Sequence, residues 1–379
     1  MTNNPITYAA TGATGLTYAA SGVDVEAGDL AVELMKDAVK RTHGPAVLGG
    51  FGGFAGLYDL SALGDYRRPL LATSTDGVGT KVAIAQALDI HDTIGFDLVG
   101  MVVDDIVVVG ARPLFMTDYI ATGSVVPERV AAIVRGIAAA CAVADTALIG
   151  GETAEHPGLL GPNEYDVAGA ATGIVEAERV LGPERVRAGD VLIGLASSGL
   201  HSNGYSLVRA IVKAAGWSLE RHVAEFGRTL GEELLVPTRV YATDCLALAD
   251  DAAAQVRAFT HVTGGGLAAN LARVLPAGLV ATIDRASWQV PPIFGVLRDL
   301  GSVPVADLEG TLNLGVGMVA IVAPDGVAAA LARCGSLGLP AWELGTVAER
   351  SSLTNGADMI EGTKGVQGGA VRLVNDYRF

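Results

Sequence analysis

Residues 93–110 restrict the fold more than any other stretch, because they are apolar almost throughout and yet carry three carboxylates. A helix that is apolar all round is normally buried. Asp97 and Asp104 are seven residues apart, which places them on one face of a helix, with Asp105 on the neighbouring edge. Carboxylates in such a setting need a cation, a metal ion or a wet cleft beside them. The stretch therefore predicts either a metal-binding helix or a buried helix whose acids pair with Lys or Arg elsewhere.

The charge of the chain limits the partners that it can have. A formal net charge of −15 argues against binding to nucleic acid or to an anionic membrane, because both depend on a positive field. An anionic substrate would need lysines, histidines, backbone N–H groups or metal ions close to it. With 379 residues the chain exceeds the size at which single hydrophobic cores stop growing, so we expect two domains.

The cysteines and the first residues indicate the compartment. Cys141, Cys245 and Cys334 are odd in number, far apart and in no metal-ligand spacing, which favours a reducing compartment over a disulfide framework. Residues 1–17 are small, polar and uncharged, and we expect them to form a flexible N-terminal arm without a signal peptide. No apolar run is long enough to span a membrane. We therefore expect a cytoplasmic protein.

The first helix signal follows this arm. Asp29 is a plausible N-cap, and Leu30, Leu34 and Ala38 have the i, i+4, i+8 spacing of a buried helical stripe. Lys36 falls on a different face from that stripe and is free for another role.

A glycine-rich loop comes next, with Gly49, Gly50, Gly52 and Gly53 in close succession. The loop contains a G-x-G-x-x-A pattern, but it lacks the preceding strand and the following long helix that a dinucleotide-binding fingerprint requires. Bare glycine backbone can wrap phosphate groups, so we favour a phosphate-binding loop over a structural turn.

A strand at 70–75 leads into Asp76, Thr80 and Lys81, and an apolar helical pattern follows through Leu88. A carboxylate, a hydroxyl and a lysine at a strand-to-helix junction suit Mg²⁺ and phosphate, with Asp76 on the metal and Lys81 on the phosphate. The alternative is a tight turn with an N-cap.

Glu152 is a fourth candidate metal ligand, because it follows a predicted strand and should lie in the loop after it. The other elements expected in this half are strands at 114–120, 147–150 and 166–175 and an amphipathic helix at 127–144.

A domain boundary is expected near residues 181–183, where a polar segment precedes a new strand at 190–196. The strand leads into a loop that contains His201, Ser202 and Asn203 before a helix begins at Tyr205. Such a loop can form an anion cradle, with His201 donating to a phosphate or moving a proton; in the alternative, Ser202 only caps the helix.

A second loop of this kind, His261 to Gly266, precedes a helix at 267–274, and strand and helix signals alternate to Val347. The Gly-rich, polar tail from Glu349 is expected to be partly loose.

Taken together, these ordered motifs closely resemble the phosphoribosylformylglycinamidine cyclo-ligase family, also called aminoimidazole ribonucleotide synthetase. The resemblance runs from about Tyr18 to Val347. It is carried by residues 22–24, 49–54, 76–81, 91–95, 150–155, 165–169, 197–206 and 263–266.

The resemblance implies an ATP-dependent ring closure in de novo purine synthesis, in which formylglycinamidine ribonucleotide becomes 5-aminoimidazole ribonucleotide, ADP and phosphate. It implies an α/β (α+β) fold of two domains. Residues 18–182 would bind ATP and contribute a mixed sheet to a β-barrel shared by a homodimer. Residues 183–379 would form a C-terminal α/β sandwich that closes the substrate cleft.

Phosphoryl transfer depends mainly on positioning and charge neutralisation, and the candidate residues fit these roles. We expect Asp76, Asp105 and Glu152 to hold Mg²⁺. Lys36 and Lys81 would face phosphate, and His201 would orient the substrate or handle its proton. Lys36, Asp105 and His201 form the expected catalytic set.

Two positions depart from the family pattern. Ala19 stands where the family commonly has a lysine, and Asp104 stands where it commonly has an asparagine, which adds negative charge near the metal. The alternatives are another ATP-dependent enzyme of the same superfamily, such as formylglycinamidine ribonucleotide synthase or thiamine-monophosphate kinase, and a catalytically silent ATP-binding scaffold.

Overall fold

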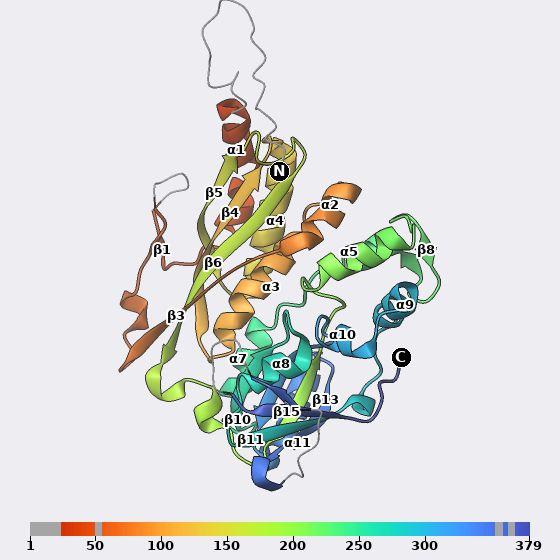
Figure 1. The fold of residues 1–379 in the computed structure, drawn as a ribbon. Helices are drawn as coiled ribbons and strands as arrows, with labels where there is room; N and C mark the ends of the chain where they lie inside the picture. The colour runs from red at the N-terminus through yellow and green to blue at the C-terminus, as the bar shows by residue number, and fades with distance from the viewer. Residues whose placement is uncertain (1–23, 50–54, 353–358, 363–367) are drawn as a thin grey trace, which may run out of the picture.

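The computed structural model describes residues 24–49, 55–352, 359–362 and 368–379, and Figure 1 shows how they are arranged. The described chain is a mixed α/β fold built around two larger sheets. The first is made by residues before 177 and the second by residues after 190. The boundary predicted near residues 181–183 falls in the connection between the two sheets and stays a prediction. The arm predicted for residues 1–17 lies outside the described residues.

The first sheet has four strands in the order β3-β6-β4-β5. β4 and β5 are parallel, and the other two pairs are antiparallel. The strands are β3 (Pro69–Gly77), β4 (Arg112–Thr122), β5 (Ala147–Glu155) and β6 (Tyr165–Glu176). A short hairpin of β1 (Val47–Leu48) and β2 (Leu57–Tyr58) precedes them.

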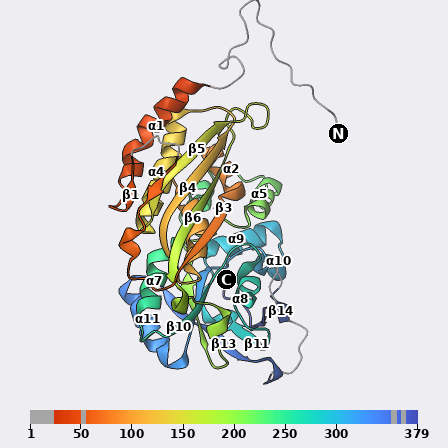
Figure 2. The same ribbon diagram turned by 90° about the vertical axis from the view of Figure 1, so that its left-hand side faces the viewer.

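Helices cover one face of this sheet. α3 (Ile94–Val107) packs against β3 and β6, α4 (Pro127–Val143) packs against α3, and α1 (Val25–Lys40) packs against α4. The short helix α2 (Val82–Leu88) follows β3. The opposite face turns toward the viewer in Figure 2, with no helix lying over its strands.

The second sheet has seven strands in the order β10-β12-β7-β13-β11-β15-β14, with only β11 and β15 parallel. The strands are β7 (Val191–Ala196), β10 (Val256–His261), β11 (Leu279–Asp284), β12 (Val316–Val322), β13 (Ala341–Glu349), β14 (Met359–Glu361) and β15 (Ala370–Val374). A separate hairpin is formed by β8 (His222–Val223) and β9 (Arg228–Thr229). The helices are α5 (Tyr205–Ala214), α6 (Leu230–Leu234), α7 (Ala242–Asp250), α8 (Gly266–Ala272), α9 (Pro292–Gly301), α10 (Val305–Glu309) and α11 (Val327–Ser336).

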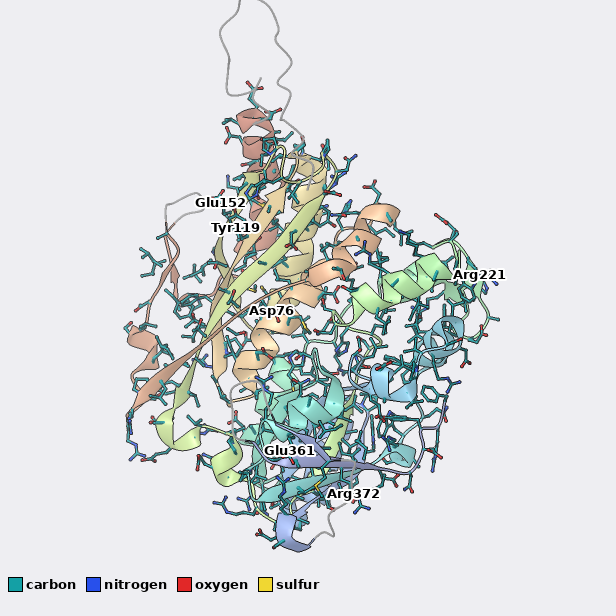
Figure 3. All side chains as sticks on the ribbon, in the orientation of Figure 1. Asp76, Tyr119, Glu152, Arg221, Glu361 and Arg372 are labelled. Carbon is teal, nitrogen blue, oxygen red and sulfur yellow. The ribbon has the colours of Figure 1, made fainter. Side chains whose placement is uncertain are left out.

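The tail of the chain takes part in this sheet. β14 and β15 pair with each other, and β15 also pairs with β11; Figure 3 marks Glu361 and Arg372 on the two strands. The sequence did not predict these strands, because glycines interrupt the apolar pattern. Backbone pairing with neighbours already in the sheet outweighs the weak local signal.

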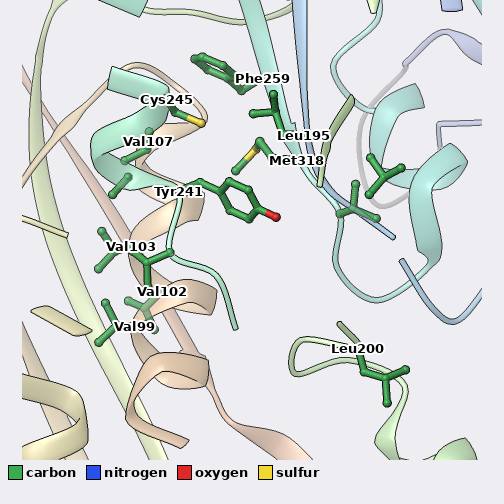
Figure 4. Packing of buried hydrophobic residues seen from close by; sticks show 14 of the residues in the cluster. Val99, Val102, Val103, Val107, Leu195, Leu200, Tyr241, Cys245, Phe259 and Met318 are labelled. Carbon is green, nitrogen blue, oxygen red and sulfur yellow. The ribbon is translucent and has the colours of Figure 1, made fainter. Parts of the chain in front are cut away.

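α3 connects the two halves through its apolar surface. Figure 4 shows four of its valines facing side chains of α7 and of the second sheet. They are Val99, Val102, Val103 and Val107, and all four are fully buried. The buried apolar helix expected at residues 93–110 is therefore confirmed.

The first helix differs from its prediction. It begins at Val25 and is capped by Asp24, whose side chain accepts the N–H of Ala27, so Asp29 is not the N-cap. Leu30 and Leu34 are about half exposed, and the buried positions are Ala31, Ala38 and Val39.

All three cysteines are free and buried. No helix among the described residues has the length and apolar character needed to cross a bilayer.

Candidate active site

The first acid of α3, Asp97, forms a buried ion pair. The Nζ atom of Lys81 lies 2.7 Å from Asp97 Oδ1, and neither side chain is exposed. Lys81 also donates to the carbonyl oxygens of His201 (3.0 Å) and Val236 (2.7 Å). An ammonium group has three N–H donors, so none remains for a phosphate in this structure. The prediction that Lys81 faces phosphate does not fit this arrangement, because burial has turned the lysine into a structural partner of Asp97.

Asp104 is also buried and faces the protein interior. Both of its carboxylate oxygens lie 3.0 Å from the backbone N–H of Tyr241, which donates to them. Burial raises the pKa of Asp104 to about 7. The carboxylate at the position that departs from the family pattern is thus fully buried and held by the backbone of Tyr241.

Asp105 is the acid of α3 that reaches solvent. His261 Nδ1 lies 2.9 Å from Asp105 Oδ1, and the imidazole itself is buried. Burial alone would lower the pKa of His261, but the hydrogen bond to Asp105 and the charges of Asp104, Asp105 and Asp76 raise it. His261 at the end of β10 therefore holds Asp105 in place.

Asp76 lies at the end of β3, close enough to Asp105 and His261 for their charges to affect it. Burial raises the pKa of Asp76, the backbone N–H of Gly77 lowers it, and the nearby charge of Asp105 raises it further. Two carboxylates that repel each other at one site, both hard oxygen donors, are suited to a divalent cation such as Mg²⁺.

The loop before α5 lies next to these acids. Ser202 donates to the carbonyl oxygen of Val78 over 2.6 Å, and Asn203 Nδ2 lies 3.1 Å from the Sδ atom of Met101 on α3. Gly264 is also close, since a Cβ there would lie 3.3 Å from Asn203 Oδ1. The hydroxyl group of Ser202 and the amide group of Asn203 thus both contact residues of the first half of the chain.

Thr80 joins the same region, with its hydroxyl 3.2 Å from that of Ser206 in the first turn of α5. We call Asp76, Thr80, Asp105, Asn203 and His261 the junction site. Its members come from β3, the 3-10 turn Gly79–Lys81 that follows it, α3, the loop before α5, and β10.

His201 does not reach this site through its ring. The side chain is 1% exposed, and Nε2 accepts the backbone N–H of Ser198 over 3.1 Å. Burial lowers the pKa of His201 well below its usual value, so the ring is neutral. The predicted proton-handling role does not fit this position; the ring supports the loop that carries Ser202 and Asn203.

Glu152 lies apart from Asp76 and Asp105, contrary to our expectation. It belongs to β5, which continues through it, so it is not in a loop. β5 is three strands from β3, and at about 4.8 Å per step the two strands are roughly 14 Å apart. Figure 3 accordingly labels Glu152 beside Tyr119 and away from Asp76.

The two acids also belong to opposite faces of the sheet. Asp76 is in register with Gly169 and, through it, with the buried Asp118. Glu152 is in register with the exposed Tyr119, one residue along. Successive residues of a strand point to opposite faces, so the three predicted ligands cannot surround one ion within a single chain. Among the described residues, no group of three His, Cys, Asp or Glu side chains is arranged to hold a metal ion.

Glu152 instead lines a cavity of about 680 Å³ between α1 and the edge of the first sheet. Gly49 lines it too, whereas Gly50, Gly52 and Gly53 fall outside the described residues. Lys36 lies on α1 and forms an ion pair of 3.1 Å with Glu33. Its catalytic role therefore stays a prediction.

Two residues whose side chains suit binding or catalysis were not predicted from the sequence. The sequence identifies His261 only as the first residue of a glycine-rich loop. Its position directly before that loop is the one signal that could have marked it as a site residue. Asp118, a buried carboxylate that lines the cavity, lies in an apolar strand pattern that gave no reason to single it out.

Comparison with known proteins identifies the family. The model "AIR synthase related protein, N-terminal domain" matches residues 59–175, and "AIR synthase related protein, C-terminal domain" matches residues 187–355. The chain is 50% identical over 338 residues to the phosphoribosylformylglycinamidine cyclo-ligase of Geobacillus kaustophilus (strain HTA426), covering 89% of this chain and 97% of that protein. It is 52% identical over 313 residues to the same enzyme of Desulfitobacterium hafniense (strain DSM 10664 / DCB-2), covering 83% of this chain and 91% of that one.

Solved structures share the fold at low sequence identity. Thiamine-monophosphate kinase from Stenotrophomonas maltophilia K279a has a TM-score of 0.65 at 21% identity, covering 90% of this chain and 95% of that one. The hydrogenase maturation protein HypE in complex with ATP has a TM-score of 0.56 at 17% identity, covering 90% of each chain. These two show the fold alone, whereas the sequence matches identify the family. The chain belongs to the phosphoribosylformylglycinamidine cyclo-ligase family.

Proposed function

We propose that this chain closes the imidazole ring of 5-aminoimidazole ribonucleotide at the junction site, using Mg-ATP and formylglycinamidine ribonucleotide. As a member of its family the chain is an ATP-dependent C–N ligase of purine biosynthesis. The observation that carries the residue assignment is the pair Asp76 and Asp105, which meet beside His261 at the contact between the two sheets.

In the proposed reaction the formyl oxygen of the substrate attacks the γ-phosphorus of ATP, and the bond to ADP breaks. The ribose-linked nitrogen then attacks the activated carbon, and phosphate leaves with the former formyl oxygen while one proton is lost. Both steps build up negative charge on phosphoryl oxygens. The chain's task is to position the reactants and to neutralise that charge.

We assign Asp76 and Asp105 to Mg²⁺, which would screen the phosphate charge. His261 fixes the carboxylate of Asp105 through a bond of 2.9 Å. Thr80, Ser202 and Asn203 are proposed phosphate contacts, with Ser202 shaping the loop through its bond to Val78. The backbone N–H groups in the first turn of α5 supply further donors for an anion.

We further propose that two copies of the chain form the active enzyme. The uncovered face of the first sheet exposes Leu71 (65%) and Tyr119 (42%). Its edge strands are β3, which carries Asp76, and β5, which carries Glu152. A second copy that pairs its β5 with β3 would bring Glu152 of one chain toward Asp76 of the other. The role proposed for Glu152 is therefore at the interface beside the partner's site, and not as a third ligand of the ion held by Asp76 and Asp105.

The same proposal places the enzyme in the cytoplasm, as the sequence predicted from its cysteines. All three are free and buried, which suits a reducing compartment.

A catalytically silent scaffold was the alternative that Asp104 could have favoured. Its carboxylate is fully buried and accepts the N–H of Tyr241, so it gives no support to that alternative.

The direct test is to incubate the purified chain with Mg-ATP and formylglycinamidine ribonucleotide. We expect 5-aminoimidazole ribonucleotide, ADP and phosphate in equal amounts. ATP hydrolysis without the aminoimidazole product would reject the proposed activity.

A further inference from the structure

Residues 309–315, which follow α10, lie against the loop before α5 and against the start of α8. A Cβ added to Gly204, at the end of that loop, would overlap the side chain of Leu312, and one added to Gly266, the first residue of α8, would overlap the carbonyl oxygen of Glu309. Both glycines also have a positive φ, a conformation that other residues rarely adopt. The positions of both loops at the junction site therefore depend on where residues 309–315 lie.

Hydrogen bonds add to this contact. The buried side chain of Asn313 donates through Nδ2 to the carbonyl oxygen of Gly199 over 2.9 Å. Its Oδ1 accepts the hydroxyl of Ser197 over 3.2 Å and the backbone N–H of Gly315 over 2.8 Å. The loop before α5 is thus bound to residues 309–315 at its beginning as well as at its end.

The C-terminal residues hold the first residue of this segment. Arg285 donates to both carboxylate oxygens of Glu309, from Nε over 2.5 Å and from Nη2 over 3.1 Å. Its Nη1 donates to the carbonyl oxygen of Asn375 over 3.2 Å, and its guanidinium carbon lies 5.6 Å from the ring centroid of Tyr377. Burial raises the pKa of Tyr377, and the charge of Glu309 and a hydrogen bond to it raise that pKa further. Tyr377 and Arg285 therefore fix Glu309 together.

The same tyrosine supports the other end of the segment. Trp288 donates its indole N–H to the carbonyl oxygen of Leu314 over 2.9 Å. Tyr377 packs edge-on against Trp288, with 5.4 Å between the ring centroids. The N–H of Val290 donates to the carbonyl oxygen of Arg378 over 2.8 Å, and Figures 1 and 2 both place the C-terminus beside α9 and α10.

These contacts are not part of the sheet. β15 ends at Val374, so they are made by residues beyond the last strand. We propose that Tyr377 is a positioning residue for the reaction, which fixes residues 309–315 and, through them, the two loops of the junction site. The inference rests on the proposed function, because it assumes that these loops hold reactant phosphates. A displacement of about 1 Å in groups that position a reactant can reduce the rate by about 100-fold.

The test uses the full chain and four variants. Tyr377→Ala removes the contacts with both ends of the segment, and Tyr377→Phe keeps the ring but removes the hydroxyl. Val371→Ala is the control for lost stability, because Val371 is fully buried in β15 and is paired with Ala281 and Ile360. Asp376→Ala, which changes an exposed residue beside the tyrosine, is the second control.

Hydrogen–deuterium exchange is followed in peptides that cover residues 309–315. We expect exchange there to become about tenfold faster in Tyr377→Ala, because local opening needs less free energy when the tyrosine is absent. Both controls should stay within about twofold of the wild type, since amides that exchange by local opening do not report a loss of global stability.

Steady-state kinetics connect the segment to the reaction. The KM for Mg-ATP should rise about tenfold in Tyr377→Ala, and it should stay within about threefold in Tyr377→Phe, whose ring still packs against Trp288. A smaller folded fraction would lower kcat and leave KM unchanged, so KM separates positioning from a merely structural role. Both controls should keep the wild-type KM.

Unchanged exchange of residues 309–315 in Tyr377→Ala, or an equal increase in Val371→Ala, would overturn the inference. So would faster exchange without a change in the KM of either reactant, in proteins that melting curves show to be folded at the assay temperature. The exchange measurement needs no activity. A wild-type chain that forms no product counts against the proposed function, whereas exchange still decides whether Tyr377 holds this segment.

Discussion

Lys81 and Asp97 are both fully buried, and the ammonium group of Lys81 is surrounded by three acceptors. Taking both charges out of water is unfavourable, and their attraction offsets that loss only while both are present. The pair links the segment after β3 to α3, and the carbonyls of His201 and Val236 bring two further loops to it. Its main role is therefore to hold the junction site together.

Replacing Lys81 by Met tests this role. We expect the free energy of unfolding to fall by about 3–5 kcal/mol, because Asp97 would remain as a buried, uncompensated charge. Urea unfolding gives the value. Lys213→Met, which changes an exposed lysine, should alter stability by less than about 0.5 kcal/mol. An unchanged stability together with a raised KM for ATP would instead favour the phosphate role first expected for Lys81.

Asp118 should make stability depend on pH. Its pKa is about 7 in the folded chain, above the value of about 3.9 expected for an unfolded aspartate. Its protonated form therefore stabilises the fold fully below about pH 4, and that contribution is lost as the pH rises through about 7.

Urea unfolding at pH 5 and at pH 8 measures this loss. Asp118→Asn cannot ionise, so its stability should fall less between the two pH values than that of the wild type. Other titrating groups are common to both proteins and cancel in the comparison. A fall of the same size in both proteins would show that Asp118 titrates in its usual range.

At the scale of elements, α1 shows that the residues buried by a helix need not be its largest. Ala31 and Ala38 lie against the rest of the fold, and α1 packs against α4 at close range. Leu30 (49% exposed) and Leu34 (43% exposed) are the larger side chains, yet they remain exposed beside this contact. Of the predicted stripe Leu30, Leu34 and Ala38, only Ala38 is buried, because the buried surface of α1 is made by Ala31, Ala38 and Val39.

Two substitutions distinguish the faces. Ala38→Leu should destabilise the chain by about 1–3 kcal/mol, because Ala38 is 6% exposed and has no room for added methylenes. Leu34→Gln should change stability by less than about 0.5 kcal/mol. Chemical denaturation compares them, and the reverse order would show that Leu34 and not Ala38 is the buried position of the predicted stripe.

Local patterns were sufficient to predict β3, α3, β4 and α4, because each has a strong apolar period or a clear cap. They also pointed to Asp76, which lies at a strand-to-helix junction, and to Asp105, a carboxylate in an apolar helix. The strand order β3-β6-β4-β5 is a long-range property, and it decides that Glu152 lies apart from Asp76. Sequence spacing carries no information on that order.

Long-range packing, which sequence spacing does not reveal, also explains why the roles predicted for Lys81 and His201 do not fit the structure. A lysine at a strand-to-helix junction has the same sequence context whether it meets phosphate or a buried aspartate 16 residues away. His201 lies in a polar loop, but its ring packs near Tyr241, at 6.0 Å between ring centroids. Tertiary packing determines both outcomes.

At the scale of the whole molecule, the proposed dimer makes a specific claim about which chain supplies which acid. If Asp105 of one chain works with Glu152 of the other, a mixed dimer of Asp105→Asn and Glu152→Gln chains has one site with both substitutions and one site with neither. Each homodimer should be inactive, and the mixed dimer should recover about half of the wild-type rate per dimer.

Coexpression with two different affinity tags isolates the mixed dimer for this assay. Recovery of activity would require residues from two chains in each site. A mixed dimer as inactive as its parents would show that Glu152 does not act across an interface. A monomer by sedimentation that is fully active would reject the dimer itself.

The most direct test of the proposed Mg-ATP site is to measure the rate of 5-aminoimidazole ribonucleotide formation by the Asp105→Asn variant and to compare it with that of the Asp325→Asn variant, which changes an exposed carboxylate. We predict that Asp105→Asn loses activity by at least about 100-fold, the scale of removing one group that stabilises transition-state charge, while its melting temperature stays near that of the wild type. Asp325→Asn should keep the wild-type rate. A folded Asp105→Asn protein that forms product within about twofold of the wild type would contradict the assignment of the junction site as the place where Mg-ATP is held.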